Sequence, residues 1–443
     1  MNTTRRAFIT ALGVLSVGIL PKVDARYPRP YLREAVRSRW MANQVALTSK
    51  NVLFLGLPRY ARDKPTPSLA KRNASGEVVP FPGNHWNEWE PGKDATEAFV
   101  YLNSVHIFHD DTIWCVDQGA LSAGVFSEKY SVPAPGAQKL VQLHPETGEI
   151  LSIIRFDDKI LPAGAQMNDL RFHGSILYIS DSGLGGIIIH DLSTGITQRR
   201  LSGRKVTKAS DKAPPAILAS IKGGKTFHAP NSDMIEITAD GKWLYWASPT
   251  GPLYRIETRL LLDNQYSDDD LLPYVEKVYD NNFSGGCCMD SEGNIYFSET
   301  VTHNITVLSS TGETRVLVSD NRLLRPDGSF ISDDRQLYIP VKTPRKNNNT
   351  NATGERPFVV YSVGLPGIFE GIKLGGPVKG QQPFCRLLRS AEHQMPGTHL
   401  AFTAQRHICQ RCKNVIKKPS VITKQQFVHF PNYLVYQIRY FLT

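Results

Sequence analysis

Three polar residues stand at matching points of a repeated sequence unit, where they could bind or transform a small polar molecule. They are Asn168 of MNDLRF, Asp233 of PNSDMIEITADG and Asp327 of RPDGSFISDD. Amide and carboxylate oxygens bind hydroxyl, amine or cationic groups, and a carboxyl with a raised pKa can shuttle a proton. We therefore take Asp233 as the tentative catalytic residue and predict that all three bind the ligand.

Two further residues are ligand-binding candidates because of where they stand. Asp169 follows Asn168 directly, and Asn103 stands just before the strand of the second repeat. A structural interpretation competes with the functional one at all of these positions, because Asn and Asp side chains also satisfy backbone donors in turns.

A repeated unit predicts how these residues come together. A polar turn followed by an alternating apolar strand recurs six times, with gaps of 60, 64, 67, 51 and 42 residues between the matching aromatic residues. Irregularly spaced turn-and-strand repeats are typical of a β-propeller, whose inner strands converge on a channel. We predict an all-β, six-bladed β-propeller with the candidate residues at the channel mouth. The matching aromatics are Phe54, Trp114, Tyr178, Tyr245, Tyr296 and Tyr338.

Other segments predict hairpins and one helix. Residues 139–156 and 186–201 each form an alternating run, a turn ending in Gly, and a second run, which predicts two hairpins. The GLGG at 183–186 lacks the spacing and the following helix of a phosphate loop, so it predicts a turn. Residues 267–279 predict a helix, because Ser267 or Asp268 can cap it and acidic residues fill its first turn.

Composition and charge bound the partners. The chain has 443 residues, of which 41% are hydrophobic, and a formal net charge of +10. Nine basic residues against one acidic give residues 381–443 a charge of +8, and residues 1–25 carry +2, so residues 26–380 have no net charge. A body without net charge does not attract phosphate, so we expect no nucleic-acid partner. We expect a monomer whose partner is a small molecule.

The sequences of the two ends indicate an export signal at the start of the chain and an appended tail at its end. Residues 1–25 place Arg5 and Arg6 before a short apolar run, which predicts a twin-arginine-type signal peptide. We expect a secreted or periplasmic protein without stable membrane insertion after cleavage, and assign residues 26–380 to the propeller. The tail, 381–443, is basic and does not resemble a blade. Its Cys409 and Cys412 form half a zinc motif, and the second pair is missing.

Six segments resemble the Yellow/major royal jelly protein family in the family's order. This resemblance implies a six-bladed, extracellular propeller that binds a small organic ligand, such as an aromatic amine, in its central channel. Whether the protein is an enzyme that also converts this ligand, by an isomerase or tautomerase reaction, is left open. The resemblance also implies that Asn304 belongs to the ligand pocket. The segments are NVLFLGLPRY (51–60), IWCVDQG (113–119), LYISDSGLGGIIIHDLSTG (177–195), ITADGKWLYWASPTGPLYRI (237–256), SETVTHNITVL (298–308) and PFVVYSVGLP (357–366).

The chain is more distantly similar to lactonase propellers of the gluconolactonase type. This similarity implies a divalent cation at the channel mouth, with Asn168, Asp233 and Asp327 at comparable positions. Gly285 of SGGCCMD falls where that group has a carboxylate. Because calcium takes about six to eight oxygen ligands, we predict no firmly bound cofactor and at most a weak divalent cation such as calcium.

Three functions remain open at this point. The first is a Yellow-like propeller that binds a small ligand, with or without converting it, and the second is a metal-assisted lactonase or esterase of the gluconolactonase type. The third is a non-catalytic protein that uses the propeller rim. No G-x-S-x-G motif occurs in the sequence, so we propose no covalent catalysis.

Overall fold

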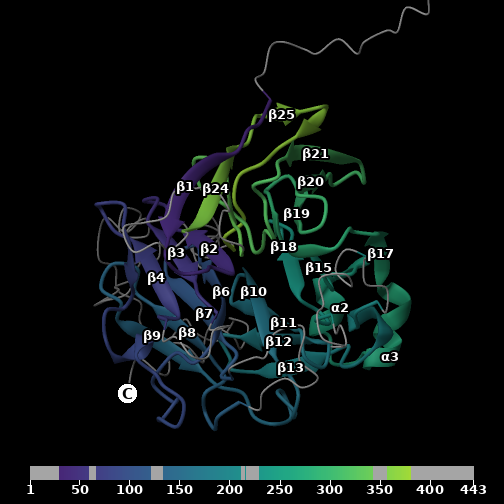
Figure 1. Ribbon diagram of the computed structural model, residues 1–443. Coiled ribbons are helices and arrows are strands. Elements are labelled where there is room, and N and C mark those ends of the chain that lie inside the picture. Colours follow the sequence, from purple (N-terminus) through teal and green to yellow (C-terminus); the bar gives the residue numbers. More distant parts are fainter. Residues whose placement is uncertain are drawn as a thin grey trace, which may run out of the picture.

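The computed structural model describes residues 29–58, 66–120, 133–210, 215, 229–342 and 357–380. In these residues, six four-stranded antiparallel sheets stand in a ring, so the protein is a six-bladed β-propeller, as predicted (Figure 1). The proposed signal peptide and the basic tail lie outside the described residues. No helix among the described residues is long and apolar enough to cross a membrane.

Each blade is a meander whose first strand lies nearest the channel. Blade 1 contains β2 (Gln44–Leu47), β3 (Leu53–Gly56), β4 (Leu69–Arg72) and β5 (Val78–Pro80). Blade 2 contains β6 (Leu102–Ile107), β7 (Ile113–Asp117), β8 (Lys139–Leu143) and β9 (Ile150–Ile154). Blade 3 contains β10 (Met167–His173), β11 (Ile176–Asp181), β12 (Ile187–Asp191) and β13 (Thr197–Arg200).

The second half of the ring repeats this order. Blade 4 contains β14 (Met234–Ile237), β15 (Trp243–Ala247), β16 (Leu253–Glu257) and β17 (Glu276–Tyr279). Blade 5 contains β18 (Ser284–Met289), β19 (Ile295–Glu299), β20 (Asn304–Leu308) and β21 (Thr314–Ser319). Blade 6 contains β22 (Phe330–Ile331), β23 (Gln336–Pro340), β24 (Phe358–Gly364) and, from the other end of the chain, β1 (Arg33–Ser38).

The strand β1 closes the ring. It pairs antiparallel with β24, with Arg33 opposite Ser362 and Ser38 opposite Phe358. Blade 6 therefore takes its outermost strand from the start of the described chain and its other three from the end. This pairing ties the first blade to the last by main-chain hydrogen bonds.

The repeated aromatic residues lie in the second strand of every blade. Phe54, Trp114, Tyr178 and Tyr296 are almost completely buried, Tyr245 is buried, and Tyr338 is half-buried. They pack in apolar layers between neighbouring blades; Phe54, for example, shares one cluster with Val105 and Ile107 of the next blade. The repeat thus marks the core contacts that hold one blade on the next.

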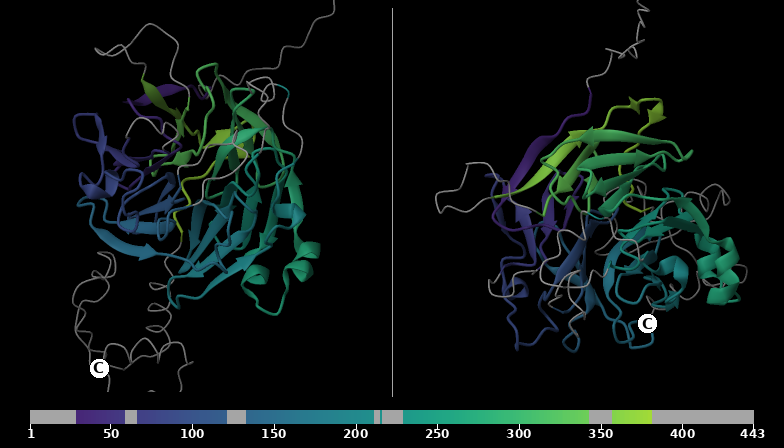
Figure 2. Two further views of the ribbon diagram at one scale, coloured as in Figure 1. Left: turned by 60° about the horizontal axis from the view of Figure 1, so that its bottom comes forward. Right: turned by 45° about the vertical axis from the view of Figure 1, so that its right-hand side comes forward.

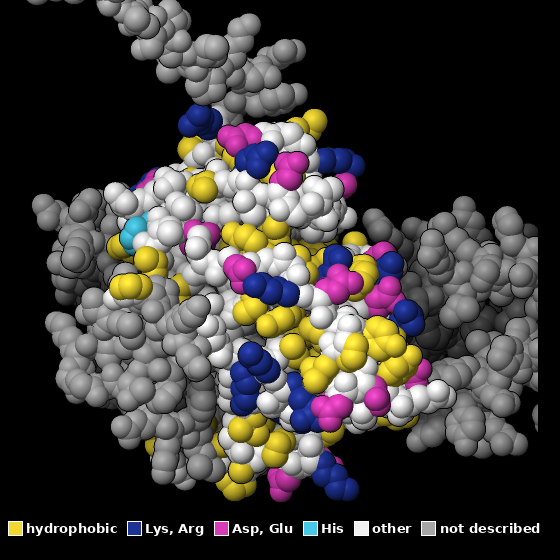
Figure 3. Space-filling model, turned by 90° about the vertical axis from the view of Figure 1, so that its right-hand side faces the viewer, with side chains coloured by type: hydrophobic (Ala, Val, Ile, Leu, Met, Phe, Trp, Pro, Cys, Tyr) yellow, Lys and Arg dark blue, Asp and Glu magenta, His cyan; other side chains and the backbone are white. Residues whose placement is uncertain are grey.

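In the described part of the chain, a few short helices connect or flank the strands of the blades. They are α2 (Thr258–Leu262), α3 (Asp268–Leu271) and the short 3₁₀ turns η1 (His85–Asn87), η2 (Lys205–Thr207) and η3 (Leu272–Tyr274). Two further views show α2 and α3 on the outer side of blade 4 (Figure 2). On this side hydrophobic and charged side chains of both signs are interspersed (Figure 3).

One element prediction was wrong in extent, and the hairpin predictions were confirmed. Ser267 caps α3 with a capping box, but α3 ends at Leu271 and only the 3₁₀ turn η3, which contains Pro273, follows it. The last part of the predicted helix, 276–279, is strand β17. Proline removes a helical hydrogen bond, and β17 completes the sheet of blade 4. Residues 139–156 contain the hairpin β8–β9, and residues 186–201 contain β12–β13. Cys287 and Cys288 are buried free thiols.

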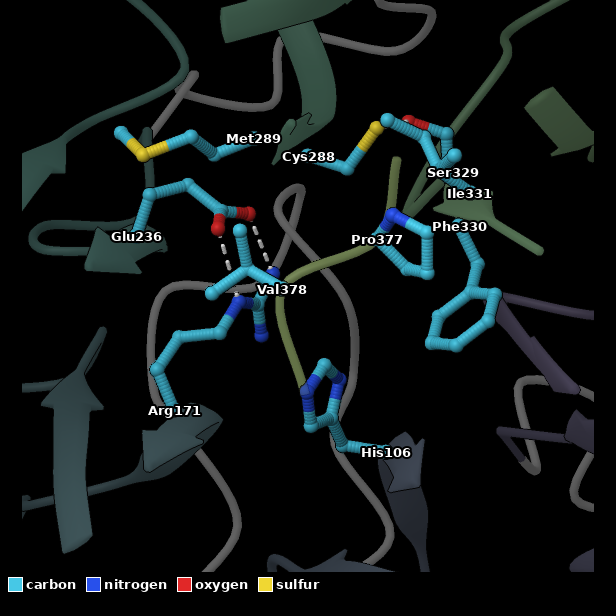
Figure 4. Close-up of a pocket in the computed structure, with 10 residues that line it drawn as sticks. All are labelled: His106, Arg171, Glu236, Cys288, Met289, Ser329, Phe330, Ile331, Pro377 and Val378. Atoms are coloured by element: carbon cyan, nitrogen blue, oxygen red, sulfur yellow. Dashed lines mark hydrogen bonds and ion pairs between the residues drawn. The ribbon is translucent and has the colours of Figure 1, made fainter. Parts of the chain in front are cut away.

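A segment that follows the small hairpin β25 (Ile368–Phe369) and β26 (Ile372–Lys373) crosses one end of the channel. We call this segment, residues 374–380, the strap. Asp290 accepts a hydrogen bond from the Gly375 N–H (2.7 Å), and the Ser291 N–H donates to the Gly376 carbonyl (2.9 Å). Pro377 and Val378 lie between side chains from the first strands of blades 2 to 6 (Figure 4). The strap therefore occupies the channel axis and closes this end.

Candidate functional site

Six equivalent positions, one in each blade, surround the end of the channel opposite the strap. Each stands where the chain enters the first strand of its blade, as shown by the hydrogen bonds from the Asn43 N–H to Gly56 and from the Asp233 N–H to Ala247 (2.9 and 3.0 Å). The pairing of the first two strands is interrupted by bulges at or beside three of these positions, and bulges re-aim side chains. We call the six positions the mouth ring: Asn43, Asn103, Asn168, Asp233, Gly285 and Asp327.

Side-chain amides link four blades of the mouth ring in sequence. The Asn43 Nδ2 donates to the Asn103 Oδ1 (3.3 Å) and carbonyl (3.2 Å), and the Asn103 Nδ2 donates to the Asn168 Oδ1 (2.9 Å) and carbonyl (3.1 Å). Asn168 in turn is hydrogen-bonded to the carboxyl group of Asp233. Because each amide oxygen is occupied by the preceding donor, the last NH₂ group is directed at Asp233. This amide relay fixes both Asn168 and the Asp233 carboxyl.

Asp233 is the titratable group of the relay. Its side chain is half-buried, and its pKa is raised to about 8, mainly by burial and then by the negative charge of Asp327. The Asp169 carboxylate raises the pKa further, whereas the Lys342 ammonium and the hydrogen bond from Asn168 lower it. Near neutral pH both protonation states are thus populated, as an acid–base group requires.

Asp327 faces Asp233 across the mouth and carries its own cation. It is buried, and its Oδ2 forms an ion pair with the Lys342 Nζ. Burial raises the pKa of Asp327, and Lys342 opposes this shift. A bridge between Pro326 and Val341 holds Lys342 beside the mouth, and the Lys342 N–H donates to the Arg325 carbonyl (3.1 Å).

A second group of charges lies one layer deeper. The Arg171 guanidinium lies between two carboxylates, 2.8 Å from the Asp169 Oδ2 and 2.6 Å from the Glu236 Oε1. Gln44 also donates to the Asp169 Oδ2 (3.3 Å). Asp169 therefore faces the mouth as an already paired carboxylate. This suits it to shaping the potential around Asp233.

Below Arg171 a small cavity separates the mouth from the strap. It is lined by the Arg171–Glu236 pair, His106, Cys288 and the strap residue Val378, among others (Figure 4). Its volume of about 10 Å³ is close to the minimum that one water molecule needs. His106 is buried, and its pKa is lowered well below the usual value by burial and by Arg171 and Lys379. This cavity therefore has no room for a ligand larger than a water molecule.

Gly285 explains why blade 5 contributes no side chain to the mouth ring. A Cβ atom at this position would lie 2.2 Å from the Pro326 carbonyl oxygen, far inside contact distance. Blades 5 and 6 therefore approach each other by their backbones here. A carboxylate at position 285 would require one of the two blades to shift.

The mouth ring does not fit a divalent cation. Blade 5 offers no ligand, and the Asp327 carboxylate is already paired with an ammonium group. No three His, Cys, Asp or Glu side chains converge as a metal site among the residues that the structure describes. Because calcium needs about six to eight oxygen ligands, this donor set is too small as arranged.

The structure brings together most of the predicted residues, but not all of them. Asn103, Asn168, Asp233 and Asp327 belong to the mouth ring, and Asp169 adjoins it. Asn304 begins β20, the third strand of blade 5, and pairs there with Ser319 of the outermost strand. It therefore lies away from the channel mouth, because β20 is two strands removed from the first strand.

Sequence reasoning missed Asn43 and Lys342. A usable signal existed for Asn43, because each mouth-ring residue precedes its blade aromatic by 10 to 12 residues, and Asn43 precedes Phe54 by 11. Lys342 stands after the second strand of blade 6, outside the repeated position. No spacing in the sequence points to it.

Comparison with known proteins gives structural matches only. No family model matches the chain, and no curated protein matches it. A gluconolactonase from Xanthomonas campestris matches with a TM-score of 0.46 and 10% identity, over 76% of this chain and 90% of that one. Regucalcin, a calcium-binding protein from Agrobacterium tumefaciens, matches with a TM-score of 0.44 and 13% identity, over 79% and 96%. Virginiamycin B lyase from Staphylococcus aureus matches with 0.44 and 11%, over 76% and 100%. These comparisons give no support to the resemblance to the Yellow/major royal jelly family.

Proposed function

We propose that this propeller hydrolyses a small lactone or related ester in the mouth of its channel, with Asp233 as the general base and then the general acid. The observation that carries the proposal is the place of the Asp233 carboxyl. It ends the amide relay, is partly exposed at the channel mouth, and faces Asp327 and Asp169.

The reaction needs one proton taken and one returned. The Asp233 carboxylate accepts a proton from a water molecule, whose oxygen attacks the ester carbonyl carbon. The ring C–O bond then breaks, and the proton passes from Asp233 to the departing oxygen, so that the product is a hydroxy acid. An Asn168 NH₂ group beside Asp233 can donate to the carbonyl oxygen as negative charge develops on it.

A lactone suits this site because a single carboxyl can serve both proton transfers. In a ring ester the leaving oxygen stays attached to the acyl group, so it remains near the base that activated the water. The water-sized cavity and the strap below Arg171 keep such a ring in the mouth. Export, as predicted from residues 1–25, would place this reaction outside the cytoplasm.

A second candidate is a proton-shuttle isomerase or tautomerase, the conversion that the Yellow-like resemblance implies. One observation favours it: the carboxylates nearest Asp233 are both paired, Asp327 with Lys342 and Asp169 with Arg171. A reaction that moves one proton between two atoms of the same substrate needs only one such group.

The test uses the full-length protein with a panel of γ- and δ-lactones and simple acetate esters, in the presence of a chelator. We expect lactone hydrolysis that the chelator leaves unchanged and that Asp233→Asn lowers by roughly 10²-fold to 10⁴-fold. The matched control is Asp240→Asn, in the exposed turn at the opposite end of β14, which should keep the wild-type rate.

Two outcomes would contradict the proposal. Hydrolysis that the chelator abolishes would point to a metal-assisted lactonase instead. Absence of hydrolysis, together with Asp233-dependent exchange of α-protons in enolisable carbonyl compounds followed by NMR, would favour the isomerase.

A further inference from the structure

We infer that the ammonium group of Lys342 is the resident cation of the channel mouth, and that it supplies the positive charge for which this mouth would otherwise need a divalent metal ion. The inference concerns the mouth ring itself and does not depend on which substrate binds there. Lys342 is thereby a positioning residue that acts through Asp327 and Asp233.

The first argument is where the ammonium lies. The Lys342 Nζ contacts the Asp327 Oδ2, and only 18% of the Lys342 side chain and 6% of the Asp327 side chain are exposed. The same charge acts on Asp233, the neighbouring acid of the mouth ring. One cation thus serves two carboxyl groups from different blades, as a bridging metal ion would.

The second argument is the charge balance of the mouth. Two carboxylates, Asp169 and Asp327, raise the pKa of a third, Asp233. Arg171 neutralises Asp169 from the layer below, where it also pairs with Glu236. Lys342 is the cation that contacts Asp327 and also acts on Asp233, and the Arg325 guanidinium lowers the pKa of Asp327 more weakly. Without Lys342, neither acid would keep the cation that now opposes their mutual repulsion most strongly.

The third argument is that a metal ion and Lys342 exclude each other. An ion that bridged Asp233 and Asp327 would have to displace the ammonium from the Asp327 Oδ2. Blade 5 cannot replace the lost interaction with a ligand, because a Cβ at Gly285 would lie 2.2 Å from the Pro326 oxygen. The close approach of the backbone at Gly285 and the Lys342–Asp327 ion pair are therefore two parts of one mouth structure that leaves no place for a metal ion.

The experiment measures thermal unfolding of the full-length chain from pH 5 to pH 10, with chelator and with millimolar calcium. The variants are Lys342→Met, Lys342→Arg and the control Lys373→Met, which removes an exposed lysine that pairs with Glu292. A carboxyl whose folded-state pKa is raised loses stability as pH rises up to that pKa. In wild type this loss should therefore end near pH 8, where the pKa of Asp233 lies.

The expected result has three parts. Calcium and chelator leave the wild-type melting temperature unchanged. In Lys342→Met, the loss of stability continues about one pH unit or more further into the alkaline range, because the cation that lowered the acid pKa values is gone. Lys342→Arg restores the wild-type profile, and Lys373→Met never departs from it. A calcium-induced rise in Lys342→Met that Lys373→Met lacks would also support the inference.

Two results would overturn it. One is a calcium-induced rise of the wild-type melting temperature that the chelator reverses, since the mouth would then hold a metal beside the lysine. The other is a Lys342→Met profile that coincides with that of Lys373→Met. Neither result depends on lactone hydrolysis, so a failure of the proposed reaction is recognised separately.

Discussion

Two lysine–aspartate pairs, one inside blade 2 and one at the channel mouth, put the same two side chains to different uses. In blade 2 the Lys139 Nζ lies 3.0 Å from the Asp117 Oδ2, and both side chains are completely buried. Lys139 also donates to the carbonyls of Ala95, Ala98 and Ala137 (3.0, 2.7 and 2.8 Å). The three N–H groups of the ammonium therefore all have acceptors.

The aspartate of the blade 2 pair is equally occupied. Asp117 accepts hydrogen bonds from the backbone N–H groups of Val100, Tyr101 and Gly119, each at 2.9 Å. These bonds fix the segment that leads into β6 and the turn after β7. The pair has a structural role, because its hydrogen-bonding groups are satisfied by protein atoms and none is left to bind a ligand.

The mouth pair differs because its charges are not balanced locally. Lys342 and Asp327 face a third group, Asp233, whose pKa of about 8 shows that the available positive charge does not fully stabilise its anion. The comparison teaches that burial and pairing alone do not identify function. What distinguishes the mouth is Asp233, whose pKa lies close to physiological pH because the surrounding charges do not fully stabilise its carboxylate.

The largest expected effect is on the blade 2 pair. Lys139→Met leaves the buried Asp117 charge without its cation and three carbonyls without the Lys139 donor, which should lower the free energy of unfolding by roughly 3–5 kcal/mol. Urea unfolding measures this loss. Lys342→Met, in the partly exposed pair, should lower the free energy of unfolding clearly less. Equal losses would contradict the assignment of different roles to the two pairs.

A smaller effect is expected at Asp327. Asp327→Asn removes a negative charge that raises the pKa of Asp233 and leaves Lys342 available to Asp233, so the pKa of Asp233 should fall by about one unit. The rate of lactone hydrolysis, which should rise with pH through about 8 in wild type, would then rise at a lower pH. The pH–rate profile measures the shift, and a shift to higher pH would show that the charges do not interact as described. Asp117→Asn, even where it folds, should leave the midpoint unchanged.

The smallest effect is expected at the start of the amide relay. Asn43→Ala removes the donor to Asn103, two steps from Asp233, and should cost about 1 kcal/mol of stability. The hydrolysis rate should fall only a few-fold, because Asn103 still contacts Asn168 directly. A loss as large as that of Asp233→Asn would mean that the relay, and not the carboxyl alone, decides activity.

The fold and the positions of the strands around the site could be predicted from the sequence better than the individual residues of the site. Regular aromatic residues revealed the second strands because those side chains must fill the layers between blades, and Asp233 and Asp327 converge because the repeats place them alike. Asn43 was missed although it precedes Phe54 by the same interval that separates the other mouth-ring residues from their aromatic residues. Lys342 could not be found, because a cation from a different strand reaches the mouth only through the twist and closure of blade 6.

Two other differences have similar causes. The helix predicted over 267–279 followed from local capping, whereas strand β17 is required by the sheet of blade 4, a demand that local sequence does not express. Asn304 was placed in the ligand pocket by the Yellow-like resemblance alone, and its position in the third strand of blade 5 was not visible without pairing information.

The strap closes the channel at one end. Because residues 374–380 cross the axis opposite the mouth, a molecule cannot pass through the propeller, and in the proposed hydrolysis substrate and product would have to exchange at the mouth. Turnover then depends on the product leaving before the next substrate can enter, so product release competes directly with substrate entry. A polymer could present only a chain end or a short side branch to Asp233, which makes the strap a limit on substrate size.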